Sequence, residues 1–151
     1  MTKSDELRYE VKRLKAISVR QPWAEAIIHN GKFIENRSWP TEFRGLVCIH
    51  ASKTRDDYAM RKYIKLLERV DPSSSGHLPR ELDSLPLGAI VGVAEVVDCV
   101  TFADSAWFEG PFGFVLHNVR PIEPVPCRGA LGFFDLPIDV LEKVLSQLEI
   151  T

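Results

Sequence analysis

The order of apolar and polar positions predicts a strand and then a helix near the start of the chain. Residues 16–19, Ala-Ile-Ser-Val, read as a strand. Gln21-Pro22-Trp23 then turns the chain into a helix expected to run to about Asn30, because proline in the first turn of a helix loses no hydrogen bond. Gly31 follows as a residue able to adopt the left-handed conformation that closes a helix.

The next segment predicts two strands and a long helix. Residues 32–38 alternate between two faces, and the apolar run at 46–50 is a stronger candidate strand. A helix of about four turns is expected to open at 52–54, where Thr54-x-x-Asp57 resembles a capping box, and to end by Val70.

The second half of the chain has the pattern of strands and ends with a helix. Residues 89–97 are apolar on both faces, as in a strand buried inside a barrel or a covered sheet, and 112–119 is a further strand. The prolines that follow predict an extended loop. These prolines are Pro121, Pro124 and Pro126. A short strand at 132–134 precedes a C-terminal helix at 138–148 that packs Val140, Leu141, Val144 and Leu148 inward.

Together these elements predict an α+β fold, a small mixed β-barrel of about five or six strands with helices on its outside. Residues 15–137 are expected to form the domain, and 138–151 a C-terminal helix packed on it. Residues 1–14 form a leader that is either a short amphipathic helix, from the spacing of Leu7, Val11 and Leu14, or disordered.

Composition agrees with one ordinary globular domain and excludes several classes of protein. The 151 residues are 45% hydrophobic and 26% charged, which is typical of a folded domain. Apolar runs such as 88–97 are far shorter than the roughly 20 residues of a membrane helix, and the first residues lack the apolar core of a signal peptide. We therefore expect a soluble, cytoplasmic protein without a membrane partner.

The residue types needed for a metal or cofactor site do not occur at suitable spacings. Three cysteines and four histidines are scattered along the chain without a Cys-x-x-Cys pair, although ligands distant in sequence can converge in space. No P-loop, dinucleotide fingerprint or nucleophile elbow is present. We expect no metal and no cofactor.

Charge is divided unevenly along the chain. Residues 1–70 carry 15 Lys and Arg against 9 Asp and Glu, and residues 71–151 carry 4 against 12. The first part therefore has a net charge of +6 and the second of −8. This division is compatible with a localised phosphate-binding face, and equally with an ordinary solvated surface.

Four short motifs, taken in order, carry a resemblance to a known family. They are Ser-Val-Arg-Gln-Pro-Trp-Ala at 18–24, Gly-Lys-Phe-Ile-Glu-Asn-Arg at 31–37, Arg-Gly at 44–45 and Ile-His-Ala-Ser-Lys at 49–53. This set resembles the ASCH domain, the activating-signal-cointegrator homology family, which has a PUA-like β-barrel. The segments 112–116 and 124–129 are similar to the longer members, and the resemblance covers about residues 15–137.

The resemblance implies a cleft at the barrel edge that binds RNA, or a nucleotide or modified nucleoside derived from it; DNA is a further candidate partner. Some members are enzymes, among them small amidohydrolases that act on acetylated cytidine and proteins with ribonuclease activity. The amidohydrolase type agrees with this chain at Gly31 and Lys32 but has threonine where this chain has Glu35.

We therefore expect a nucleic-acid or nucleotide-binding domain that uses a basic cleft. The alternative is a metal-independent hydrolase, a ribonuclease or nucleoside amidohydrolase, acting in the same cleft. A third hypothesis is an interaction adaptor that uses an apolar surface of four aromatic residues. These are Phe112, Phe114, Phe133 and Phe134.

Lys32, Glu35 and Arg37 are the central candidate residues. Gly31 and Lys32 at a helix-to-strand corner hold an ammonium near backbone that a ligand can approach, and Glu35 and Arg37 share one face of the following strand. If the site is catalytic, Lys32 acts as the base once burial or a cationic neighbour lowers its pKa, and Glu35 positions it or relays a proton. In the plainer interpretation, Glu35 and Arg37 pair with each other and Lys32 is solvated.

Three further candidates have a binding and a structural interpretation. Trp23 offers a face for base stacking or belongs to the core. His50 closes a strand, where it contacts the ligand or is a hydrogen-bonded core group. Gln21, which belongs to the first motif, is included as a binding residue on the resemblance.

The remaining candidates are suited to binding phosphate. Arg20, Arg44 and Lys53 lie near predicted strand ends, where their charges neutralise phosphates or are simply solvated. Ser52 and Lys53 also open the predicted helix, whose free N–H groups form an anion site.

Glu95 is the most unusual residue of the predicted strand at 89–97. Because its neighbours are apolar on both faces, its carboxylate is expected to pair with a buried cation, or else to have a raised pKa. Substitution of Lys32 or Arg37 is then expected to weaken ligand binding with little effect on melting temperature, and Glu95→Ala to do the reverse.

Overall fold

The computed structural model describes residues 2–3, 14–70 and 84–148. Within these residues the elements follow in the order β1, α2, β2, β3, α3, β4, β5, β6, α4. The strands are β1 Lys15–Val19, β2 Ile34–Arg37, β3 Gly45–Ala51, β4 Ala89–Val100, β5 Phe112–Pro126 and β6 Phe133–Asp135. The helices are α2 Trp23–His29, α3 Ala59–Val70 and α4 Ile138–Leu148.

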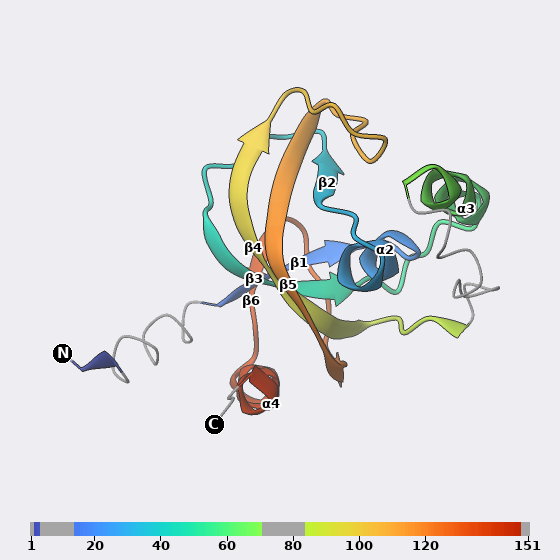
Figure 1. Cartoon of the computed structure of the whole chain (residues 1–151). Helices are drawn as coiled ribbons and strands as arrows, with labels where there is room; N and C mark the ends of the chain where they lie inside the picture. Colours follow the sequence, from blue (N-terminus) through green and yellow to red (C-terminus); the bar gives the residue numbers. More distant parts are fainter. Residues whose placement is uncertain (1, 4–13, 71–83, 149–151) are drawn as a thin grey trace.

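All six strands belong to one mixed sheet, in the order β2-β5-β4-β3-β1-β6. β1 pairs with β3 in parallel, and every other neighbouring pair is antiparallel. β4 and β5, with 12 and 15 residues, are long and bent, so the sheet curves into a half-barrel (Figure 1). The predicted α+β barrel of five or six strands is confirmed.

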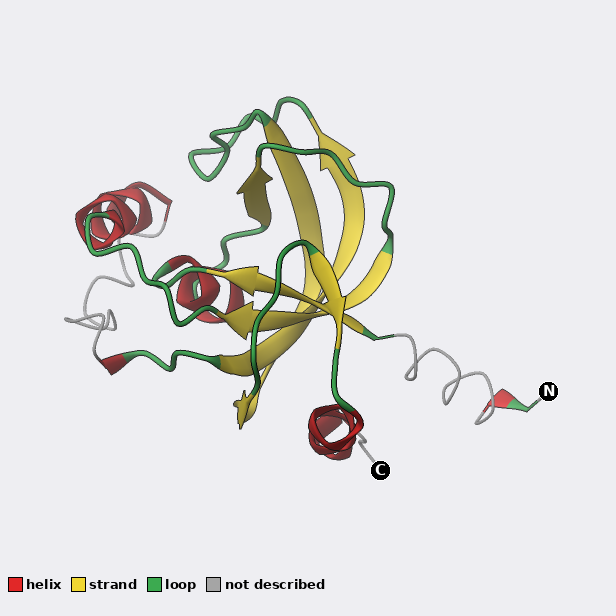
Figure 2. Ribbon diagram, turned by 180° about the vertical axis from the view of Figure 1, so that it is seen from behind, coloured by secondary structure: helices red, strands yellow, loops and turns green. Residues whose placement is uncertain are grey.

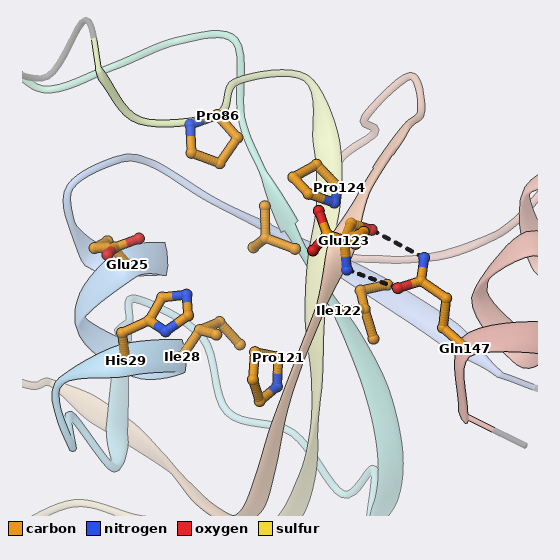
Figure 3. A pocket seen from close by; sticks show the side chains of 10 residues that line it. Glu25, Ile28, His29, Pro86, Pro121, Ile122, Glu123, Pro124 and Gln147 are labelled. Atoms are coloured by element: carbon orange, nitrogen blue, oxygen red, sulfur yellow. Dashed lines mark hydrogen bonds between the residues drawn. The ribbon is translucent and has the colours of Figure 1, made fainter. Parts of the chain in front are cut away.

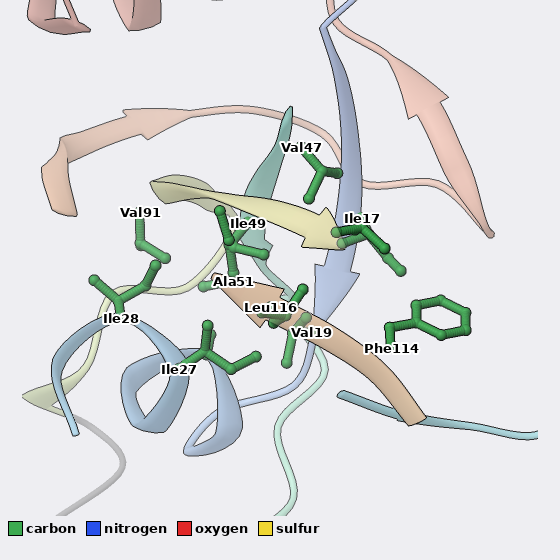
Figure 4. Packing of buried hydrophobic residues seen from close by; sticks show 13 residues of the cluster. Ile17, Val19, Ile27, Ile28, Val47, Ile49, Ala51, Val91, Phe114 and Leu116 are labelled. Carbon is green, nitrogen blue, oxygen red and sulfur yellow. The ribbon is translucent and has the colours of Figure 1, made fainter. Parts of the chain in front are cut away.

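The concave side of the sheet holds the first apolar core (Figure 4). α2 contributes Ala24, Ile27 and Ile28 to it and packs on β3, β4 and β5. The close approach depends on Gly92, because a Cβ there would lie 2.4 Å from Ile28 Cδ1 and 2.7 Å from the Arg120 carbonyl oxygen. The helix predicted from Trp23 to about Asn30 therefore forms one wall of the half-barrel.

A second core lies on the other face of the sheet, beneath α4. Val140, Leu141 and Val144 are buried there as predicted, and Leu148 is partly buried. Each such aliphatic side chain stabilises the fold by roughly 1.5 to 3 kcal/mol. α4 lies well apart from α2 and α3 in both views (Figures 1 and 2).

The second half of β5 differs from the prediction of a loop. Pro121, Pro124 and Pro126 all lie within the strand. Ile90 pairs with Val125 and Gly92 with Pro121, so residues 122–124 bulge opposite Val91. The bulge contains Pro124, which has no N–H to donate, whereas Pro121 and Pro126 are the register partners of Gly92 and Ala89. Three prolines so close together make the sequence pattern of this strand resemble a loop.

α3 begins at Ala59, several residues later than the predicted start at 52–54. The N–H of Ala59 donates to the Asp56 side chain at 3.2 Å, so Asp56 occupies the capping role expected of Thr54. Ser52 Oγ accepts from the Thr54 N–H at 3.0 Å. These local side-chain hydrogen bonds compete with helix formation, so the segment before Ala59 does not become helical. The predicted helix start is therefore wrong.

Glu95 and the phenylalanines also differ from the predictions. Glu95 is half-buried and forms no ion pair with any residue that the structure describes. The predicted buried pair is wrong, because the buried part of β4 ends at Val96. The next residue, Val97, is exposed. Phe114 is fully buried, and Phe112, Phe133 and Phe134 are half-buried, so these four residues do not form the exposed apolar surface that the adaptor hypothesis requires.

Most of the predicted leader, residues 4–13, lies outside the described residues. Leu14, its last residue, is buried in the second core. None of the helices in the described ranges has the length and apolar character required to cross a membrane.

Candidate functional site

Lys32 reaches the site because of the way α2 ends. Gly31 has φ +74°, a conformation that favours glycine, and turns the chain so that the Lys32 N–H donates to the Ala26 carbonyl oxygen at 3.0 Å. The Lys32 side chain is then only 4% exposed, and its Nζ lies 5.8 Å from the centre of the Trp23 ring. The solvated lysine of the plainer interpretation is therefore wrong.

Lys32, Glu35 and Arg37 form one charged cluster. Lys32 Nζ donates to the Ile34 carbonyl oxygen and lies 3.5 Å from Glu35 Oε1. Arg37 donates to Glu35 Oε2 from Nε at 3.1 Å and from Nη2 at 2.9 Å. The Glu35–Arg37 pair of the plainer interpretation is thus present, with Lys32 as its third member.

Arg37 also connects strands that are not neighbours in the sheet. Its Nη2 donates to the Ser18 carbonyl oxygen of β1 at 2.6 Å. β2 is at one edge of the sheet, whereas β1 is next to the opposite edge. Arg37 therefore connects β2 to β1 across the half-barrel, and both residues of this contact, Arg37 and Ser18, line the site.

Burial lowers the pKa of Lys32 from its ordinary value of 10.5, while the nearby Glu35 carboxylate raises it and Arg37 lowers it further. Desolvation is the largest of these effects because the ammonium is removed from water. A larger fraction of Lys32 is therefore neutral near pH 7 than in an exposed lysine, which favours a role as proton acceptor.

The cluster opens into a cavity of about 550 Å³, called the cleft from here on. Its lining residues are Ser18, Val19, Arg20, Trp23, Lys32, Glu35, Asn36, Arg37, Ser38, Trp39, Asp56, Leu66, Trp107 and Glu109. Three tryptophans are among them, and Trp23 both lines the cleft and meets Tyr63 edge-on at 6.0 Å. Both interpretations of Trp23, core and cleft, thus describe parts of its surroundings.

The cleft is less basic than the sequence predicts. Arg20, Lys32 and Arg37 are opposed by three carboxylates in the lining, those of Glu35, Asp56 and Glu109. Lys32 and Arg37 are engaged with Glu35. Among the described residues, the exposed Arg20 has no ion-pair partner, so it is the lining cation most available to a phosphate.

Asn36 is a site residue that the sequence analysis did not single out. Its Nδ2 donates to the Trp107 carbonyl oxygen at 3.0 Å, and its Oδ1 accepts from the N–H groups of Glu109 at 2.8 Å and Gly110 at 3.0 Å. Glu109 also pairs with Lys62 of α3. Asn36 thus fixes the segment 107–110 against the cleft. Its place inside the motif at 31–37, Gly-Lys-Phe-Ile-Glu-Asn-Arg, was the available signal.

We expect Asn36→Ala to lower the free energy of unfolding by about 1 to 3 kcal/mol, because it leaves two N–H groups and one carbonyl without partners. Asn36→Asp keeps the two acceptor contacts but places a carboxylate oxygen against the Trp107 carbonyl oxygen, so it should recover only part of the stability. Urea denaturation followed by tryptophan fluorescence measures both. Equal stability of Asn36→Ala and the parent chain would show that segment 107–110 is held by other contacts.

Two predicted site residues lie beside the cleft as internal supports. Gln21 is fully buried: its Nε2 donates to the Pro86 carbonyl oxygen at 3.1 Å, and its Oε1 accepts from the Glu25 N–H at 2.9 Å. His50 is also buried, with Nε2 2.7 Å from the Cys127 carbonyl oxygen and Nδ1 2.8 Å from Ser18 Oγ.

These contacts determine the state of His50. Because a carbonyl can only accept, Nε2 carries the proton, and neutral Nδ1 accepts from the Ser18 hydroxyl. Burial lowers the pKa of His50, and the bond to Cys127 opposes this. His50 is thus a neutral, hydrogen-bonded core group beneath a residue that lines the cleft.

Three other predicted site residues lie outside the cleft lining. Arg44 donates to the Thr41 and Phe43 carbonyl oxygens and lies 3.8 Å from Asp98 Oδ1. Ser52 and Lys53 belong to the segment before α3, and the Lys53 stem packs against Gly88. Because the helix does not begin there, its N–H groups are not available at Ser52 and Lys53.

Groups of three or more His, Cys, Asp or Glu side chains arranged to hold a metal ion are absent from the described ranges. The side chains that line the cleft include a buried lysine suited to accept a proton, a carboxylate suited to accept hydrogen bonds, and an arginine and tryptophans suited to binding.

Comparisons with known proteins agree with the sequence motifs. Human and mouse activating signal cointegrator 1 are each 27% identical to this chain over 122 residues, which cover 75% of this chain and 20% of either relative. The chain thus spans about a fifth of the length of these curated relatives.

Solved structures of similar fold include an ASCH protein from Zymomonas mobilis and a single-site mutant of it. They superpose with TM-scores of 0.51 and 0.52, at 15% identity, over 89% of this chain. The match covers 95% and 96% of those chains, respectively.

A family model assigns the same region. The model described as "ASCH domain" matches residues 17–126, which contain most of β1, all of β2 to β5 and all the lining residues of the cleft. ASCH domains are PUA-like domains that generally bind RNA. The chain belongs to the ASCH domain family.

Proposed function

We propose that this chain binds single-stranded RNA, or a nucleotide or modified nucleoside derived from RNA, in the cleft. The observation that carries the proposal is the convergence of Arg20, Trp23 and the Lys32–Glu35–Arg37 cluster in one cavity of about 550 Å³. This volume lies within the usual range of roughly 300 to 1,000 Å³ for small-ligand sites. Membership of a generally RNA-binding family supports the same function.

The lining matches the parts of a nucleotide unit. Glu35 is fixed by Arg37 and Lys32, so its carboxylate is oriented to accept hydrogen bonds from the N–H edge of a base. Tryptophan faces are suited to base stacking, worth about 1 to 3 kcal/mol per base. The exposed Arg20 is suited to a backbone phosphate. Because the remaining lining charges are two cations against three carboxylates, we expect one base to occupy the cleft and few phosphates to be contacted.

We expect Arg20→Ala to weaken RNA binding uniformly across sequences and to reduce the slope of log K against log salt by about one. Binding of a labelled single-stranded RNA at several salt concentrations measures this slope. Arg128→Ala is the control, since Arg128 is exposed but does not line the cleft. Equal slopes for Arg20→Ala and the parent chain would show that Arg20 does not contact a phosphate.

Hydrolysis is a second candidate function because of one specific observation, the lowered pKa of the buried Lys32. A neutral Lys32 can take a proton from an attacking water or ribose hydroxyl, and Glu35 at 3.5 Å can stabilise the ammonium that forms. The substrate would be RNA or an acylated nucleoside bound in the same cleft, and the reaction would need no metal ion.

Incubation with labelled RNA and a panel of acylated nucleosides, with and without a chelator, tests this candidate. Turnover by the parent chain should survive chelation and fall by about 10² to 10⁴ in Lys32→Met, the range typical of losing a general base. Turnover lost on chelation, or unchanged in Lys32→Met, would contradict the mechanism. Binding without any turnover would support the binding function and contradict hydrolysis of these substrates.

A further inference from the structure

A second cavity, separate from the cleft, lies between α2 and the bulged half of β5. Its volume is about 470 Å³. Figure 3 shows Glu25, Ile28 and His29 of α2 on one side and the β5 residues on the other. The lining residues are Glu25, Ile28, His29, Pro86, Val91, Pro121, Ile122, Glu123, Pro124 and Gln147. We call it the α2–β5 cavity.

The β5 wall of this cavity is held in place by α4. Gln147 Oε1 accepts from the Glu123 N–H at 2.6 Å, and its Nε2 donates to the Glu123 carbonyl oxygen at 3.0 Å (Figure 3). The Gln147 amide thus takes the place of a neighbouring strand at the bulge. Proline fixes its own backbone, and three lining residues are prolines. The wall is therefore preformed, which reduces the entropy lost when a ligand binds.

The lining of the α2–β5 cavity combines aliphatic walls with negative charge. Ile28, Val91 and Ile122 supply apolar surface, and Glu25 and Glu123 supply two carboxylates. Neither carboxylate forms an ion pair with a residue in the described ranges, and the lining contains no Lys or Arg. This differs from the cleft, where three cations balance three carboxylates.

The charge of Glu25 is compensated only in part. Burial raises its pKa, and the neighbouring His29 opposes this only in part. A partly desolvated carboxylate gains stability when a cation approaches it, because an opposite charge replaces the lost hydration. The cavity therefore favours a positively charged group over a neutral or anionic one.

We propose that the α2–β5 cavity binds an aliphatic cation, an alkylammonium or alkylguanidinium group whose stem packs between Ile28 and Ile122 while its charged end meets Glu123 and Glu25. Apolar walls with a few placed polar groups are the usual composition of a small-ligand site. The same chemistry is offered by a free amine and by a Lys or Arg side chain of another polypeptide. The proposal does not depend on the function of the cleft.

Titration with butylguanidinium, followed by the methyl NMR signals of Ile28, Val91 and Ile122, tests the proposal. Butylurea, which has the same shape without the charge, is the matched probe. We expect saturable shifts with butylguanidinium and much smaller ones with butylurea. Glu123→Gln should weaken binding by about fivefold, the size typical of one exposed charge pair. Glu142→Gln on the exposed side of α4 should leave it unchanged.

A peptide that carries a single arginine distinguishes the two sources of the cation. Tighter binding of the peptide than of butylguanidinium would identify a side chain of a partner polypeptide, and equal or weaker binding would identify a free small cation. No saturable shift with butylguanidinium, equal affinity for butylurea, or unchanged affinity in both Glu123→Gln and Glu25→Gln would overturn the proposal. The melting temperature of Glu123→Gln serves as an independent check that the variant is folded.

Discussion

Arg37→Ala is expected to lower the free energy of unfolding by about 2 to 3 kcal/mol. The substitution removes both hydrogen bonds to Glu35 Oε2 and the donor to the Ser18 carbonyl oxygen. Glu35, which is 9% exposed, then keeps only the more distant Lys32 as a partner. Removing one member of a buried ion pair is costly because it leaves the other charge without compensation.

Urea denaturation at pH 7 measures this effect, with Arg37→Lys as the companion variant. Lysine keeps the charge but lacks the planar fork that contacts Glu35 and Ser18 together, so it should recover only part of the stability. A loss below about 0.5 kcal/mol in Arg37→Ala, the scale of ordinary surface substitutions, would contradict the bridging role. The sequence analysis predicts only a small loss of stability for Arg37 substitution, because the sequence does not show the contact of Arg37 with β1.

Lys32→Met should affect function strongly and stability hardly at all. Methionine fills a similar volume beneath Trp23, and replacing a buried charge with an apolar side chain is often neutral or stabilising. Glu35 retains its two bonds to Arg37 in this variant. We therefore expect the free energy of unfolding at pH 7 to stay within about 1 kcal/mol of the parent value, or to rise, while ligand affinity in the cleft falls by about tenfold or more.

The pH dependence of stability gives this prediction a distinct signature. Because burial lowers the pKa of Lys32 in the folded chain, the unfolded chain holds more protons between that lowered pKa and 10.5. The free energy of unfolding of the parent chain must then rise with pH across this window. Lys32→Met should lack that rise, and Lys65→Met, exposed on α3, should keep it. The same slope in the parent chain and Lys32→Met would contradict the assigned shift.

Much of the fold was predictable because local patterns agree with tertiary packing. The helix at 138–148 and the strand at 16–19 were recognisable from the spacing of residues that are buried in the structure, such as Val144 and Ile17. The strand structure around Pro121, Pro124 and Pro126 could not be predicted, because its pairing and its bulge at Pro124 form only when β4 and α4 are present to hold the strand. Local capping at Asp56 likewise displaced the start of α3.

The part of the candidate site that comes from a single continuous motif was predictable from the sequence. Gly31 to Arg37 form a helix end and a short strand, so their local geometry already places Lys32, Glu35 and Arg37 together. The role of Asn36 was not predictable, because its partners lie more than 70 residues away. The contact of His50 with Cys127, 77 residues away, is hidden for the same reason, and the contact of Arg37 with Ser18 is hidden because it depends on how the sheet curves.

Comparison of the RNA affinities of the parent chain and Lys32→Met tests most directly whether the cleft is the binding site. Both proteins are titrated with the same short single-stranded RNA at one low salt concentration, with Lys65→Met as the control for loss of charge alone. We expect saturable binding by the parent chain and Lys65→Met, and an affinity lower by about tenfold or more, or about 1.4 kcal/mol, in Lys32→Met. Equal affinity of the parent chain and Lys32→Met, or no binding of RNA, DNA or nucleosides by the parent chain, would contradict a binding function in the cleft.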